Sequence, residues 1–107
     1  MNKAQYKKAV NDIWDASLEA PSGKDIVDEC MNITNLLINK NISYGNSALL
    51  PVRIFSNSSP EEQILVRIDD KLSRISMGSE YPGDDTLEDL IGYLVLLLVS
   101  RRQNANV

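Results

Sequence analysis

The sequence predicts an all-α protein: a four-helix bundle-like single domain with a long loop between the second and third helices. Apolar residues recur at spacings of three and four along four segments, which is the period of an amphipathic helix. Residues that cap helices stand before several of these segments. A chain of 107 residues suffices for one modest core, so we assign residues 1–107 to a single domain.

The first helix is predicted over about residues 3–18 and the second over about 23–40. The apolar stripe of the first consists of Tyr6, Val10, Ile13, Trp14 and Leu18. Between the two helices, "APSGKD" breaks the pattern, and Ser22 and Asp25 have the spacing of a capping box. Cys30 lies in the apolar stripe of the second helix, where we expect a small buried hydrophobe.

The segment 41–59 has neither helical nor strand periodicity. Loops of this length in small domains are usually functional or disordered. The segment contains apolar residues that we expect to fold back onto the domain, which favours a functional loop. These residues are Leu49, Leu50, Val52, Ile54 and Phe55.

The third helix is predicted over about residues 60–76 and the fourth over about 86–102. Ser59 is the expected N-cap of the third helix, with Pro60 at its first position. In "DTLE", Asp85 is the expected N-cap of the fourth helix and Glu88 its capping-box partner. The fourth helix is apolar nearly all round, so it is central to the bundle or forms an interface. We expect a homo-oligomer joined through residues 86–100.

Composition excludes several classes of function. The formal net charge is −4, which argues against bulk binding to nucleic acid or to an anionic membrane surface. There is no histidine, so nucleophile–histidine pairs and histidine zinc sites are excluded. The longest apolar run, residues 90–99, is far shorter than the roughly 20 residues of a membrane span. With one cysteine and no recognisable signal peptide, we expect a cytoplasmic protein.

Four ionisable residues follow one ridge of the third helix beside its apolar stripe. They are Arg67, Asp70, Lys71 and Arg74, at positions i, i+3, i+4 and i+7. One interpretation is pairing within the helix, because Asp70 before Arg74 is the favourable i, i+4 order. The other is an anion site in which the basic side chains bind phosphate oxygens.

Asp89 raises a separate question, because it stands one turn into a helix that is otherwise apolar. An unpaired carboxylate would be costly in that position. Either a basic residue such as Lys71 pairs with it, or it binds a divalent cation together with Asp69 or Asp70. Magnesium is the candidate metal, because it takes a few carboxylates together with water and substrate phosphates.

The stretch "NKNISYGNS", residues 39–47, is the second candidate binding element. Helix termination explains part of it: Asn41 or Gly45 suits a left-handed C-cap, and Lys40 suits the negative end of the helix. It does not explain Tyr44 and the small polar residues that follow. An exposed tyrosine next to glycine and hydrogen-bonding side chains is typical of a loop that stacks on a base or cradles a phosphate.

Three motifs, "KNISYGNS", "VRIDDKLSRI" and "DTLEDLIGYLVLL", together resemble a pattern of small, largely phage-encoded helical proteins, the nucleotide modification associated domain family. More distantly they resemble the MazG-like all-α nucleotide pyrophosphatases. The resemblance covers roughly residues 24–100. It implies a helical bundle that handles nucleotides as a dimer or larger assembly, in the cytoplasm of an infected bacterium if the chain is phage-encoded.

Three hypotheses of function follow. The first is a nucleotide-binding protein that holds a nucleotide or nucleotide-derived signal without turning it over, as an anti-defence sponge would. The second is a magnesium-dependent MazG-like nucleoside triphosphate pyrophosphohydrolase, although its acidic pairs lack the spacing of those enzymes. The third is a structural interaction protein with the fourth helix as its dimer core, in which a charge at Leu96 would abolish assembly.

The site residues follow from these hypotheses, and no catalytic residue is assigned. The predicted nucleotide-binding residues are Lys40, Tyr44, Gly45, Asn46, Ser47, Arg67, Asp70, Lys71 and Arg74. The predicted metal ligands, for the hydrolase alone, are Asp69, Asp70, Asp85 and Asp89. We expect the loop residues to form one wall of a pocket and the charged ridge of the third helix to form the opposite wall.

Overall fold

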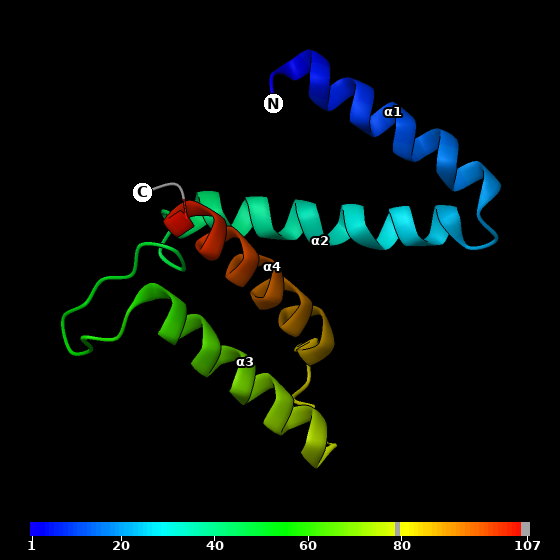
Figure 1. Ribbon diagram of the computed structural model, residues 1–107. Coiled ribbons are helices and arrows are strands. Elements are labelled where there is room, and N and C mark those ends of the chain that lie inside the picture. The colour runs from blue at the N-terminus through cyan, green and yellow to red at the C-terminus, as the bar shows by residue number, and fades with distance from the viewer. Residues whose placement is uncertain (79, 106–107) are drawn as a thin grey trace. The chain divides into compact units, whose positions relative to one another are not determined.

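The computed structural model describes residues 1–78 and 80–105, and these form four α-helices and no strand (Figure 1). The helices are α1 (Lys3–Glu19), α2 (Gly23–Ser43), α3 (Pro60–Met77) and α4 (Thr86–Ala105). The all-α prediction and the four predicted helices are therefore confirmed. None of the helices in the described ranges is long and apolar enough to cross a membrane.

Capping residues fix where the helices start. The Ser59 side chain accepts a hydrogen bond from the backbone N–H of Glu62 at 3.1 Å, with Pro60 in the first turn of α3. Asp85 accepts from the N–H of Glu88 at 2.9 Å at the start of α4. Both predicted N-caps are confirmed. A further capping box, between Asn2 and Gln5, starts α1.

The chain divides into two compact units, residues 1–36 and residues 37–107. In the first unit, a short turn joins α1 to α2. Gly23 is buried in this region, and it must be glycine because a Cβ would overlap the Ser17 carbonyl. The Lys24 ammonium stands 5.7 Å from the centre of the Trp14 ring, within the range of a cation–π contact. Cys30 is exposed, so the prediction that it is buried was wrong: its stripe on α2 has no cover at that position.

In the second unit, α3 packs against α4 around a small core. Its buried members are Leu49, Ile64 and Ile68, with Leu96 and other residues of α4 packed against them. The Arg101 side chain of α4 donates to Glu61 of α3 at 2.7 Å. A Cβ at Gly92 would lie 3.2 Å from the Leu37 side chain, so this glycine lets α4 approach the C-terminal part of α2.

The connection between α2 and α3 only partly folds back onto this core. Leu49 is buried, but Leu50, Val52, Ile54 and Phe55 are exposed, so the prediction for these four residues was wrong. A turn made by residues 44–50 positions Leu49, since the N–H groups of Leu49 and Leu50 both bind the Asn46 carbonyl, at 3.1 and 2.9 Å. Among the described residues, no backbone–backbone hydrogen bond of this kind involves residues 51–55.

Candidate functional site

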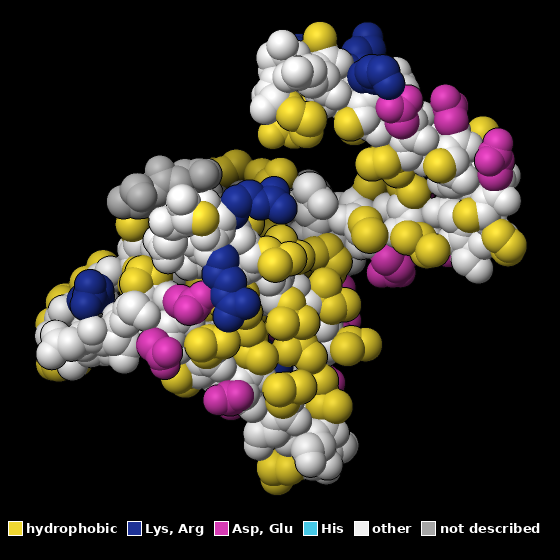
Figure 2. Space-filling view, viewed as in Figure 1, with side chains coloured by type: hydrophobic (Ala, Val, Ile, Leu, Met, Phe, Trp, Pro, Cys, Tyr) yellow, Lys and Arg dark blue, Asp and Glu magenta, His cyan; other side chains and the backbone are white. Residues whose placement is uncertain are grey.

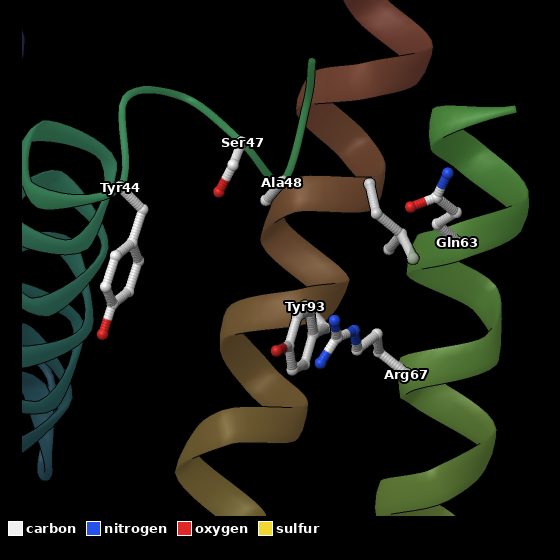
Figure 3. Close-up of a pocket in the computed structure, with 7 residues that line it drawn as sticks. Tyr44, Ser47, Ala48, Gln63, Arg67 and Tyr93 are labelled. Atoms are coloured by element: carbon white, nitrogen blue, oxygen red, sulfur yellow. The ribbon is translucent and has the colours of Figure 1, made fainter. Parts of the chain in front are cut away.

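A cavity of about 250 Å³ opens where the end of α2 and the turn after it meet α3 and α4 (Figure 3). All of its lining residues belong to the second unit. The C-terminal end of α2 and its turn contribute Tyr44, Ser47 and Ala48, α3 contributes Gln63, Ile64 and Arg67, and α4 contributes Tyr93. Two aromatic rings, one guanidinium and two hydrogen-bonding side chains therefore face one space.

The turn after α2 places Tyr44 and Ser47. Helix α2 ends at Ser43, three residues later than predicted, and Gly45 and Asn46 then both take left-handed conformations, with φ of 61° and 65°. The Asn46 N–H donates to the Asn41 carbonyl at 3.1 Å, which is the six-to-one bond of a Schellman motif. Glycine at the first left-handed position, and not Asn41, therefore ends the helix.

A side-chain hydrogen bond stabilises the second left-handed residue. The Asn41 amide donates to the Asn46 Oδ1 at 2.8 Å. Asparagine is among the few non-glycine residues that tolerate this conformation. The chain then turns so that the Ser47 N–H donates to the Tyr44 carbonyl at 3.2 Å. The small polar residues of "YGNS" therefore build the turn that forms one wall of the cavity.

Of the described residues that line the cavity, Arg67 alone is basic. It extends from α3 toward the ring of Tyr93 (Figure 3). Within the described part of the chain it forms no ion pair. A guanidinium with five donors and no carboxylate partner has the geometry to bind an anion bidentately.

An ion-pair cluster lies one helical turn away from the cavity residues on each of three helices. The Asp89 carboxylate of α4 forms ion pairs with the ammonium groups of Lys40 of α2, at 3.7 Å, and Lys71 of α3, at 3.3 Å. We call Lys40, Lys71 and Asp89 the lysine–aspartate cluster. Its side chains are partly covered, with 13% of Lys71 and 27% of Asp89 exposed. The prediction that a basic residue such as Lys71 pairs with Asp89 is confirmed.

On each of the three helices, the residue in the lysine–aspartate cluster and the residue in the cavity wall are four positions apart. Tyr44 is four residues after Lys40, Tyr93 is four residues after Asp89, and Arg67 is four residues before Lys71. Residues four apart on a helix lie on the same face. Of the four charged residues in these two layers, Lys40, Lys71 and Arg67 are basic and Asp89 is acidic.

Arg74 and Asp70, the other half of the predicted charged ridge, are not part of the cavity wall. Arg74 pairs with Asp70 at 3.3 Å and with Asp84 at 3.5 Å, and all three side chains are substantially exposed. Intrahelical pairing therefore explains these two residues. The cavity wall contains fewer of the predicted binding residues than expected, because Tyr44, Ser47 and Arg67 are the ones that line it among the described residues.

The predicted metal ligands are not gathered into one site. Asp89 is paired with two lysines, Asp70 with Arg74, and Asp85 caps α4. Within the described ranges, no three acidic or cysteine side chains lie close enough to hold a metal ion together. The magnesium site of the hydrolase hypothesis stays a prediction.

Tyr93 and Gln63 were not predicted as site residues. The sequence contains a signal for Tyr93, because it is the only aromatic residue in α4 and stands one turn after Asp89. Gln63 lies one turn before Arg67 on the same face of α3 and has an amide that already donates to the Ser58 carbonyl at 3.1 Å. That amide ties the start of α3 to the connection before it.

Replacing Asp89 by asparagine is expected to destabilise the second unit by about 1–2 kcal/mol. This figure lies between the ~0–1 kcal/mol of exposed ion pairs and the ~3–5 kcal/mol lost when one partner of a buried pair is removed, because the cluster is partly covered. Urea unfolding followed by circular dichroism measures the change. The matched control, Asp70→Asn, removes an exposed pair and should cost less than about 0.5 kcal/mol. Equal losses would show that the cluster contributes no more than a surface pair.

Comparison with known proteins finds no family model, no curated protein and no solved structure that matches this chain.

Proposed function

We propose that the second unit binds a nucleotide, with its base against the tyrosines of the cavity and its phosphate on Arg67. The observation that supports this most is the unpaired Arg67 guanidinium in a wall that also presents Tyr44 and Tyr93. Aromatic faces stack on bases of any sequence. Arginine binds phosphate through two parallel N–H donors. The two groups that distinguish a nucleotide from other metabolites therefore have matching partners in one cavity.

The size of the cavity limits how the ligand sits. Pockets that enclose a drug-sized ligand measure roughly 300–1,000 Å³, and this one measures about 250 Å³. A base and part of its sugar fill such a space, so the phosphates lie at its mouth. There Arg67 is exposed, and the excess positive charge of the lysine–aspartate cluster favours an anion.

Binding without turnover is the form of this proposal that the residues support best. The carboxylates that a hydrolase needs are paired with basic residues or cap a helix. Sequestration of a nucleotide-derived signal, as in an anti-defence sponge, would need only the cavity. The resemblance to phage nucleotide-handling proteins supports the same reading.

A screen by thermal unfolding tests the proposal. The full chain is heated with nucleoside triphosphates, deoxynucleotides or cyclic nucleotides, with magnesium or with EDTA. A ligand at 100 times its Kd stabilises by about 2.7 kcal/mol, which for a domain of this size raises Tm on the order of 10 °C. We expect at least one nucleotide to do so in EDTA and to be recovered intact by chromatography. No shift with any of them would refute nucleotide binding, and release of pyrophosphate with magnesium would favour the hydrolase.

We also infer that the chain self-associates through residues 86–100. The observation in favour is the small core of the second unit: of the described residues, three apolar ones are buried, while Leu87, Ile91, Leu94, Val95 and Leu98 of α4 remain exposed. Leu96, chosen from the sequence as the assembly position, packs instead against the core. A charge there would disrupt the fold of the unit, so it cannot report on assembly.

A further inference from the structure

Gln63 presents a hydrogen-bond acceptor in the cavity wall. Its side chain is half-buried, and its amide nitrogen donates to the Ser58 carbonyl at 3.1 Å. Because a carbonyl can only accept, this bond identifies the nitrogen end of the amide and leaves the Oε1 atom for another partner. In Figure 3 the Gln63 oxygen lies on the side of its amide that faces Tyr93. Within the described part of the chain, no group donates a hydrogen bond to this oxygen.

The other polar side chains of the wall have different hydrogen-bonding capacities. Tyr44, Ser47 and Tyr93 carry hydroxyl groups, which can donate as well as accept, and the Arg67 guanidinium only donates. Among the described side chains that line the cavity, Gln63 therefore has the polar oxygen that accepts and cannot donate. A ligand group that meets this oxygen has to supply a donor.

Nucleobases differ in whether they carry an amino group that can supply this donor. Adenine and cytosine have one where thymine has a carbonyl, and guanine has one on its other edge. Uracil, thymine and hypoxanthine have no amino group. A carbonyl placed against the Gln63 oxygen would leave two acceptors facing each other without a hydrogen bond, which is unfavourable. Stacking on Tyr44 or Tyr93 does not distinguish the bases, because every base has an aromatic face.

We propose that the cavity selects nucleotides whose base carries an amino group, and that the Oε1 atom of Gln63 is the acceptor that selects them. This rests on the proposed function and adds the class of base. Gln63 and Arg67 are one turn apart on the same face of α3, with Cβ atoms about 5–6 Å from each other. The edge of the base therefore lies toward the start of α3, and the phosphate lies one turn further along the helix.

The hydrogen bond to Ser58 makes Gln63 suitable for this role. It holds the amide in one orientation before a ligand binds. Less side-chain freedom is then lost on binding, so more of the hydrogen-bond energy is available for affinity. The same bond prevents the amide from turning round to offer its nitrogen to a carbonyl of the base, because Ser58 would lose its donor.

Two pairs of nucleotides test the selection in the wild-type chain. ATP differs from purine riboside triphosphate by one amino group, and GTP differs from ITP by one amino group, while the sugar and phosphates are the same within each pair. Isothermal titration calorimetry with the full chain in EDTA measures the four Kd values. We expect the amino member to bind on the order of tenfold more tightly, the contribution of one hydrogen bond. A preference in either pair supports the proposal and identifies the position of the amino group.

Two substitutions separate the acceptor from the bond to Ser58. Gln63→Met and Gln63→Glu both remove the amide donor, but Gln63→Glu keeps an oxygen that accepts. We expect the preference within the pair to fall to about onefold in Gln63→Met and to persist in Gln63→Glu, although the added carboxylate weakens the binding of both anionic members. Gln103→Met, the same change at an exposed position in α4 outside the cavity, should leave all four Kd values unchanged.

The other results overturn the proposal in distinct ways. Equal affinities within both wild-type pairs would show that the site binds nucleotides without selecting an amino base, and this comparison needs no variant to fold. A preference that persists in Gln63→Met, with native circular dichroism, would show that another group selects the base. If none of the four nucleotides binds, this proposal fails, and the wider thermal screen described above shows separately whether nucleotide binding fails with it.

Discussion

Replacing Arg67 by alanine is expected to weaken nucleotide binding by roughly 10- to 100-fold. Hydrogen bonds to charged groups contribute about 1.5–3 kcal/mol, and each 1.4 kcal/mol is a factor of ten in affinity. The loss should appear with little change in stability, because Arg67 is exposed and forms no ion pair within the described chain. Isothermal titration calorimetry with the nucleotide that gives the largest thermal shift measures the affinity.

Two further variants make this result specific. Arg67→Lys keeps the charge and loses the bidentate fork, so binding should fall between that of the wild type and Arg67→Ala. Arg53→Ala removes a different exposed arginine, whose guanidinium binds the Asn57 carbonyl at 2.8 Å outside the cavity. That variant should bind normally. If Arg53→Ala and Arg67→Ala lost affinity equally, the effect would be one of overall charge and the cavity would not be the site.

Replacing Ile64 by alanine is expected to destabilise the second unit by about 2–5 kcal/mol, the usual cost of removing so much of a buried aliphatic side chain. Ile64 is 2% exposed and is one of three apolar residues buried in the described structure. Small domains are stable by only about 5–15 kcal/mol in total, so a large fraction of the stability depends on this residue. Urea unfolding at 25 °C measures the loss.

The same helix supplies the control for this substitution. Val66 is 64% exposed, so Val66→Ala should change the free energy of unfolding by less than about 0.5 kcal/mol. Because Ile64 also lines the cavity, a bound nucleotide should restore part of the stability that Ile64→Ala loses. A cost below 1 kcal/mol would mean that the core around Ile64 is loosely packed and does not hold α3 against α4.

The helices were predictable because their signals are local. The N-caps Ser59 and Asp85, and the three-and-four spacing of apolar residues, lie within a few positions of the feature they determine. The extent of burial was less predictable. Cys30 and Phe55 have apolar side chains, but whether other residues cover those side chains from solvent depends on segments distant in the sequence. Leu94 and Leu96 lie on opposite sides of α4 by helix geometry, but that Leu96 packs against the core while Leu94 is exposed depends on how α3 lies against α4.

The candidate site was predicted where it depends on one helix and missed where it depends on several. The spacing of Arg67 and Lys71 shows that they share a face of α3, and "YGNS" indicates a turn. No local sequence pattern predicts that Tyr93 of α4 lines the same cavity. None predicts that Arg74 of α3 pairs with Asp84, which lies in the connection between α3 and α4. These contacts depend on how α3 lies against α4, which sequence spacing does not specify.

The single turn between the lysine–aspartate cluster and the cavity has a consequence for how this sequence can change. Each of the three helices crosses from one layer to the other in four residues. Substitutions within those steps leave the layers aligned. One inserted or deleted residue rotates everything beyond it by about 100°, which would turn Tyr44, Arg67 or Tyr93 out of the cavity. The segment 51–58 between α2 and α3 contains no helix, so an insertion or deletion there does not rotate any of these three residues. We therefore expect functional variants of this sequence to differ in length in that segment.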